Sequence, residues 1–265
     1  RADTPEQLLD EVYVPARQGT LRTEIRAAVR SRELVPVPLQ PELDAVLREV
    51  AAGRPVLVMQ NLLFDWFPQW HFAVVVGYDL EAGHVILRSG RERRRITPLA
   101  TFERTWQRSG RWAQVIVPPD ELPATAEPLR WLQVVNELEQ TGNRTAAMTG
   151  YRTATQRWPG TIEAWLARGN AAYAADDPDA ARDAFTEAVL RAPRRSAGWN
   201  NLAYALAATG CGTAARAAAR CAVALSPDDP GPKDTLEEIG SMTVTGYGDR
   251  CELPACPVDT SGAQD

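Results

Sequence analysis

The sequence predicts an α+β domain followed by an all-α repeat domain. In the first 119 residues, helical patterns come first and short β-branched runs follow, which is the order of an α+β domain. From about residue 128 the sequence repeats with a period of 34 residues, a length that suits one pair of helices. A chain of 265 residues is long enough for two domains with separate cores.

Composition and charge narrow the classes of partner. No run of 18 or more apolar residues is present, so no membrane span is predicted. The net charge is −5, but residues 1–119 hold 16 Arg and 14 Asp or Glu, whereas the remainder holds 13 basic and 20 acidic residues. An acidic second half argues against nucleic acid as a binding partner, because the phosphate backbone is negatively charged. We therefore expect a protein or peptide partner, while the oligomeric state stays open.

Three helices are expected in the first 52 residues. The first runs from Pro5 to about Val14, because Thr4 is a capping residue and proline suits the first helical position. A third runs from Pro41 to about Ala52. Between them, Gly19-Thr20 is expected to cap a second helix. Its apolar residues recur at helical spacing as Leu21, Ile25, Ala28 and Val29.

The strands come next. Two prolines limit Leu34–Leu39 to a short edge strand. Phe72–Val76 is a continuous apolar run, which is typical of a strand buried on both faces. A helix from Pro98 to about Gln107 precedes the last strand. The strand candidates are Val56–Gln60, Phe72–Tyr78, Val85–Arg88 and Trp112–Val117, of which the first three form an antiparallel meander.

Pro118-Pro119 begins a linker that continues over residues 120–127, so residues 1–119 are the first domain. Residues 128–240 then hold three tetratricopeptide repeats, the last one capped by a helical piece, Asp234–Ile239, and residues 241–265 are an irregular tail with cysteines. The columns that repeat are Trp131/Trp165/Trp199, Ala147/Ala181/Ala215, Tyr151/Phe185/Ala219, Ala154/Ala188/Ala222 and Pro159/Pro193/Pro227.

Three segments of the first domain carry a resemblance: Pro55–Asn61, Trp70–Asp79 and His84–Gly90. Together they resemble the His-bearing second half of a papain-like cysteine peptidase of the double-glycine (bacteriocin-processing) leader peptidase-like family. The resemblance implies peptide hydrolysis in which a Cys attacks and His71 acts as general base and then acid. It also implies a periplasmic or cell-envelope location, with a lipid anchor through a missing N-terminal segment, and no cofactor.

The resemblance places the nucleophilic Cys upstream of Arg1, so we expect the chain to be a processed or truncated product. The family has an Asp at the end of the strand after the histidine, where this sequence reads Leu87-Arg88-Ser89-Gly90. Ser89 or a water is therefore expected to orient the imidazole, with less electrostatic support than a carboxylate gives. The rival interpretation is a non-enzymatic adaptor with a degenerate peptidase domain. A third is a repeat scaffold with an unrelated α+β cap.

The repeats offer candidate peptide-binding residues. Asn136, Asn170 and Tyr204 occupy equivalent positions on the first helix of each pair, and Asn200 is close to the last of them. Asparagine side chains on a concave surface can hydrogen-bond the backbone of an extended peptide. A polar groove wall without a ligand is the alternative.

Four cysteines are expected to form disulfides. Cys211 and Cys221 lie ten residues apart on one predicted helix, about 15 Å, which is too far for a bond between them. Each would therefore pair with Cys251 or Cys256 in the tail, in either combination, and this suits an oxidising compartment. The Cys251/Cys256 spacing fits no zinc ribbon, so no metal is expected. Four free thiols in a cytosolic protein is the alternative.

Several other residues near the candidate histidine have two interpretations. Gln60 and Asn61 either face its cleft or simply end a strand. Trp66, Phe67 and Trp70 are expected to form the rim of a core rather than a substrate groove. The arginines of residues 91–95 are expected to lie on a solvated hairpin rather than in an anion site.

Overall fold

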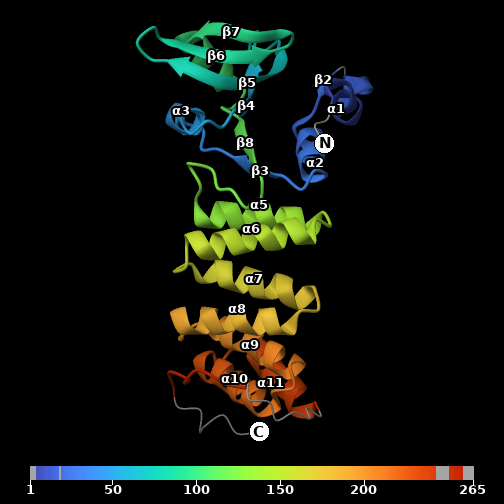
Figure 1. Cartoon of the computed structure of the whole chain (residues 1–265), viewed down its shortest axis with the longest axis vertical. Coiled ribbons are helices and arrows are strands. Elements are labelled where there is room, and N and C mark those ends of the chain that lie inside the picture. Colours follow the sequence, from blue (N-terminus) through green and yellow to red (C-terminus); the bar gives the residue numbers. More distant parts are fainter. Residues whose placement is uncertain (1–3, 18, 243–250, 259–265) are drawn as a thin grey trace. The chain divides into compact units, whose positions relative to one another are not determined.

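The computed structural model describes residues 4–17, 19–242 and 251–258. The chain forms two compact units, residues 1–146 and 147–265, which we call the front unit and the repeat unit and describe separately. The division falls inside the first copy of the repeat, so the domain limits expected from the sequence stay a prediction. The elements of both units are labelled in Figure 1.

The front unit begins with a helix, a small hairpin and a second helix. Helix α1 (Pro5–Val12) has the expected cap, in which the Thr4 hydroxyl accepts from the Gln7 backbone N–H, and the Gln7 side chain completes a capping box. It ends two residues earlier than predicted, because Tyr13–Val14 forms strand β1 and pairs with strand β2, Gly19–Thr20. The expectation that Gly19-Thr20 caps a helix is therefore wrong, and α2 (Arg22–Arg30) begins without a side-chain cap.

The centre of the front unit is an antiparallel sheet with strand order β3-β8-β4-β5-β6-β7 in the part of the chain that is described. The predicted edge strand and the meander are both confirmed. Helices α3 and α4 are also close to the predicted ranges. The bounds are β3 Val35–Pro38, α3 Leu43–Ala51, β4 Val56–Asn61, β5 Trp70–Asp79, β6 His84–Ser89, β7 Glu92–Pro98, α4 Leu99–Gln107 and β8 Ala113–Val117.

The two faces of this sheet are covered unequally. Helix α4 packs on the face that carries Gln60, where Thr105 meets the Gln60 amide and Ala73 and Val75 are buried. On the opposite face, Phe72, Val74 and Val76 remain partly exposed. The prediction of a strand buried on both faces is thus wrong for β5. A continuous apolar run does not reveal whether a second layer of structure is present to cover it.

Strand β7 was not predicted. The arginines of residues 91–95 lie on a solvated hairpin as expected, because β6 and β7 form a hairpin and these residues are exposed. The difference is that Glu92–Pro98 is itself a strand and pairs with β6. It is an edge strand whose residues 92–96 are all exposed, so its side chains lack the alternation of apolar and polar residues that marks a strand. Charged side chains on an edge strand also discourage pairing with another chain.

Helices in antiparallel pairs make up the repeats, as the period of 34 predicts. The tryptophan column closes one repeat onto the next: the indole N–H of Trp165 donates to the carbonyl of Pro159 at 2.9 Å, and Trp199 donates to Pro193 at 2.7 Å. The helices are α5 Pro128–Gln140 in the front unit, α6 Arg144–Arg157 across the boundary, and α7 Ile162–Ala174, α8 Pro178–Arg191, α9 Ser196–Ala208, α10 Gly212–Leu225 and α11 Pro230–Ser241 in the repeat unit.

The last helix and the tail differ in part from the expectation. Helix α11 begins at Pro230 and spans 12 residues, so it is longer than the predicted capping piece. Parts of the predicted irregular tail lie outside the described residues. No helix in the described ranges combines the length and the apolar character that a membrane crossing requires.

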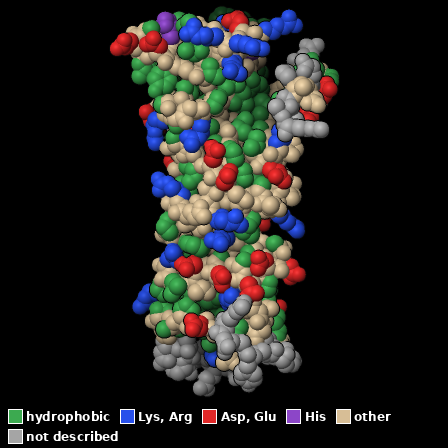
Figure 2. Space-filling model, in the orientation of Figure 1, with side chains coloured by type: hydrophobic (Ala, Val, Ile, Leu, Met, Phe, Trp, Pro, Cys, Tyr) green, Lys and Arg blue, Asp and Glu red, His purple; other side chains and the backbone are tan. Residues whose placement is uncertain are grey.

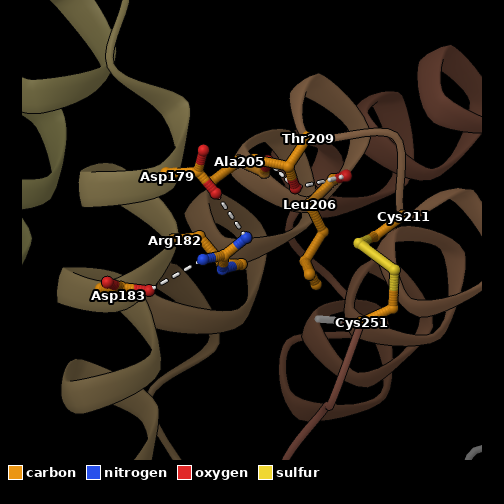
Figure 3. The surroundings of a disulfide bond; sticks show 8 residues. All are labelled: Asp179, Arg182, Asp183, Ala205, Leu206, Thr209, Cys211 and Cys251. Carbon is orange, nitrogen blue, oxygen red and sulfur yellow. Dashed lines mark hydrogen bonds and ion pairs between the residues drawn. A yellow bond between two sulfur atoms is a disulfide. The ribbon is translucent and has the colours of Figure 1, made fainter. Parts of the chain in front are cut away.

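Two disulfides attach the tail to the repeat unit, as the cysteine argument predicts. Cys211 bonds Cys251 and Cys221 bonds Cys256, with Cα–Cα distances of 5.4 and 5.8 Å. The first bond lies beside the end of α9 (Figure 3). Cys211 is the N-cap of α10 rather than a residue within the helix. The half-buried Cys251, Leu253 and Cys256 pack against the core formed by α9 and α10, so the tail adds apolar cover to that core.

Close packing in the repeats generates a test. A Cβ on Gly169 of α7 would lie 2.4 to 2.7 Å from three ring atoms of Phe185, whose ring is buried. We expect Gly169→Ala to lower the free energy of unfolding by about 1 kcal/mol or more, despite its higher helix propensity. Gly240→Ala in α11, where a Cβ meets nothing within 4 Å, should stabilise by up to about 1 kcal/mol. Denaturant unfolding compares the two, and equal effects would contradict the packing argument.

Candidate functional site

His71 lies near the start of β5, opposite Gln60 of β4. Its Nε2 atom is 2.8 Å from the Oγ atom of Ser89 at the end of β6, so the contact expected from the sequence is present. A β-bulge makes this contact possible. The register between β5 and β6 shifts between Val75 and Gly77, and beyond the shift Ser89 lies opposite Ala73, on the same face as His71.

The surroundings of His71 favour a neutral ring. The side chain is half-buried, and burial, followed by the positive charge of Arg95, lowers its pKa below the ordinary 6.5. Ser89 itself is buried. Nε2 contacts Ser89. The other ring nitrogen, Nδ1, has no hydrogen bond among the described residues. The arrangement is that of a neutral base with one ring nitrogen oriented and the other open to a proton donor.

Gln60 and Asn61 take different structural roles. The Gln60 amide donates to Thr105 Oγ1 at 2.6 Å, which ties the end of β4 to α4 on the His71 side of the sheet. Asn61 faces its own loop instead. Its Oδ1 atom accepts from the backbone N–H groups of Leu63 and Gln69, and its Nδ2 donates to the Phe64 carbonyl. Asn61 therefore holds the β4–β5 loop and does not face the histidine.

The chain supplies no thiol to His71, because all four of its cysteines are in the two disulfides. His71 also makes no ion pair with a described carboxylate. Asp79, eight residues further along β5, instead accepts from the Ala82 backbone N–H in the turn at the other end of the strand. Within the described ranges there is no cluster of three or more His, Cys, Asp or Glu side chains that could hold a metal ion.

The repeat unit has a small groove between α7 and α9. The Asn201 amide donates to Asn170 Oδ1 at 3.0 Å, and the hydroxyl of Tyr204 donates to Glu238 of α11 at 2.7 Å. Three aromatic rings and two asparagine amides thus border the same cavity of about 160 Å³. The residues that line it are Asn170, Tyr173, Ala174, Phe185, Asn201 and Tyr204.

Of the four residues predicted to bind peptide, Asn170 and Tyr204 are brought together in this groove. Asn136 is exposed on α5 of the front unit. Asn200 does not line the groove, and its Oδ1 is buried without a hydrogen-bond partner among the described residues. Its neighbour Asn201 lines the groove, because Asn201 lies opposite the buried side of α9; a helical wheel of that helix could have found it. The binding roles stay predictions.

Comparison with known proteins covers the repeats. The family model described as tetratricopeptide repeat matches residues 135–189 and 166–230. These repeats are tetratricopeptide repeats. Two similar solved structures are the first tetratricopeptide domain of Spaghetti (RPAP3) bound to an HSP90 peptide and the second such domain of human RPAP3 in complex with an HSP70 peptide. Both are 16% identical, with TM-scores of 0.40 and 0.41; the matches cover 43% and 44% of this chain and 90% and 100% of those chains. No match was found among curated protein sequences.

The electrostatics of His71 generate a test. We expect its imidazole to titrate below 6.5 in an NMR pH titration, with Arg95→Gln moving the midpoint upward. Arg48→Gln on α3 is the control and should leave the midpoint in place. Since the unfolded chain binds more protons between the folded pKa and 6.5, His71 makes stability fall as the pH drops through that window. A midpoint at or above 6.5, or one that Arg95→Gln does not move, would refute this account.

Proposed function

We propose that this protein binds a protein or peptide through its tetratricopeptide repeats and acts in the bacterial cell envelope. The observation that carries the proposal is the groove in which Asn170, Asn201 and Tyr204 place amide and hydroxyl groups beside aromatic rings. Such a surface offers hydrogen bonds to a peptide backbone and apolar contacts to its side chains. The two disulfides support an oxidising compartment such as the periplasm.

The front unit is proposed to be the second half of a cysteine-peptidase-like domain. A neutral His71, oriented through Nε2 by Ser89 and open at Nδ1, suits a general base that activates a thiol. In the intact protein an upstream Cys attacks the peptide carbonyl, and His71 takes the thiol proton and returns it to the leaving amine. Ser89 holds the ring during both transfers. The 265-residue chain by itself should be inactive.

A non-enzymatic adaptor is the second candidate. It is favoured by the absence of any ion pair between His71 and a described carboxylate, because a hydroxyl stabilises the imidazolium less than a charged partner does. In that case the front unit binds without catalysis, and the repeats carry the function.

The groove is tested by peptide binding. A peptide selected on the wild-type chain from a random library should bind the double variant Asn170→Ala/Asn201→Ala about tenfold more weakly, because two hydrogen-bonding amides are lost. Thr213→Ala, an exposed change on α10, is the matched control. Fluorescence anisotropy gives both affinities. If the control and the double variant bind alike, the groove is not the binding site.

The peptidase proposal is tested on the protein extended upstream to include the proposed Cys. His71→Ala should lower turnover of a peptide substrate by about 100-fold or more, whereas His84→Ala, the other histidine of the chain, should not. Titration with a thiol alkylator measures the pKa of the upstream Cys. A thiolate that forms well below the usual pKa of about 8.5 indicates the activated pair. An ordinary thiol without turnover would support the adaptor, and turnover by the unextended chain would contradict the mechanism.

A further inference from the structure

The loop between β4 and β5 exposes a group of large aromatic side chains. Trp66 is 82% exposed, Phe67 62%, Phe64 57% and Trp70 54%. The rings of Phe64 and Trp66 stack on each other at 5.6 Å instead of packing into the core. The sequence interpretation of Trp66, Phe67 and Trp70 as the rim of a core is therefore wrong. Apolar side chains are seldom gathered in this way on a surface that faces only water. We call these four residues the aromatic tip.

The aromatic tip is held outward by polar contacts. Asn61, which is buried, binds three backbone groups of the loop through its side chain. Two backbone hydrogen bonds, from Leu62 to Gln69 and from Phe67 to Phe64, close the loop further. A loop fixed in this way does not have to be ordered when it binds, so a partner meets the rings already in place.

Arginines gather beside the aromatic tip. Residues 88–95 contain five arginines and one acidic residue, Glu92, while residues 61–70 add only Asp65. All five arginines are exposed, and none of their side chains makes a hydrogen bond or an ion pair with a described residue. Five positive and two negative charges leave about +3 here, in a chain whose net charge is −5. Figure 2 shows Lys and Arg side chains over the part of the front unit that β6 and β7 form. The arginines are Arg88, Arg91, Arg93, Arg94 and Arg95.

The strand register brings the two groups to one end of the sheet. Asn61, after which the loop begins, pairs with Trp70, at which the loop ends. The next residue, His71, contacts Ser89, and Ser89 pairs with Glu92 at the β6–β7 turn. Ser89 also pairs with Ala73, so Glu92 lies two strands across from Ala73, and Trp70 is three residues further along β5. With about 4.8 Å between strands and about 3.3 Å per residue, the first arginines of β7 are about 15 Å from Trp70. Leu80, by contrast, is exposed in the β5–β6 turn at the opposite end.

We propose that this end of the sheet docks on an anionic lipid surface. Tryptophan and phenylalanine are suited to the boundary between headgroups and acyl chains, where an apolar ring is buried and the indole N–H stays near water. Arginine side chains beside them are attracted to anionic headgroups. A binding surface for a protein would also use aromatic residues, but five arginines whose side chains form no ion pair in the described part of the chain favour a surface of dense negative charge. The inference does not depend on the peptidase proposal.

The test is co-sedimentation of the full chain with vesicles. The wild-type chain should bind vesicles of phosphatidylglycerol and phosphatidylethanolamine more tightly than vesicles of phosphatidylcholine. Added salt should weaken the binding. Trp66→Ser/Phe67→Ser should weaken it about tenfold or more, because two large apolar side chains no longer enter the interface. Arg93→Gln/Arg94→Gln should weaken binding to the anionic vesicles alone, again by about tenfold.

Leu80→Ser is the matched control, since it removes an equally exposed apolar side chain from the far end of the same sheet. It should bind as the wild type does. All these side chains are exposed, and unchanged thermal unfolding will show that each variant is folded. The proposal is overturned if the wild-type chain stays in the supernatant with both kinds of vesicle. In that case a protein is the partner that binds the aromatic tip. Equal losses in Leu80→Ser and in the aromatic variant also overturn it.

Discussion

One irregularity in the sheet decides where the candidate catalytic side chains lie. Val76 is the extra residue of a β-bulge, and it moves the β5–β6 register by one position. Without it Ser89 would lie opposite Val74, and its hydroxyl would point to the face away from His71. The Nε2–Oγ contact follows from this register. Gly77 follows the extra residue, and a Cβ there would lie 3.2 Å from Ile86.

The same end of the sheet shows how a short polar side chain organises an apolar loop. Asn61 satisfies three backbone groups that would otherwise need water, so the loop keeps its shape without a core of its own. Its aromatic residues are consequently free to face outward. In the repeat unit the situation is reversed. There the shape comes from close apolar contact, as between Gly169 and Phe185, and asparagine side chains of α7 and α9 border the groove.

Much of this could be predicted from the sequence, for identifiable reasons. The repeats could be predicted, because Trp131, Trp165 and Trp199 recur at a spacing of 34 residues. Strands β4, β5 and β6 could be predicted, because each contains an apolar, β-branched run that ends at turn residues. Strand β7 could not be predicted, since an arginine-rich edge strand has no buried face that would require apolar and polar residues to alternate. His71 and Ser89 were found by resemblance to a peptidase family. Their contact depends on the β-bulge at Val76, which the sequence pattern did not predict. Asn201 was missed because only its neighbour Asn200 was considered.

The two disulfides have a consequence for how the tail leaves the repeat unit. Cys251 and Cys256 are bonded separately to the two ends of one stretch, Cys211 and Cys221, so either bond alone keeps the tail attached. Detachment requires both bonds to open. At equilibrium with a dithiol reductant, the detached fraction therefore rises with roughly the second power of the ratio of reduced to oxidised reductant. The attachment is insensitive to a mild change in redox poise and releases steeply under a strong one.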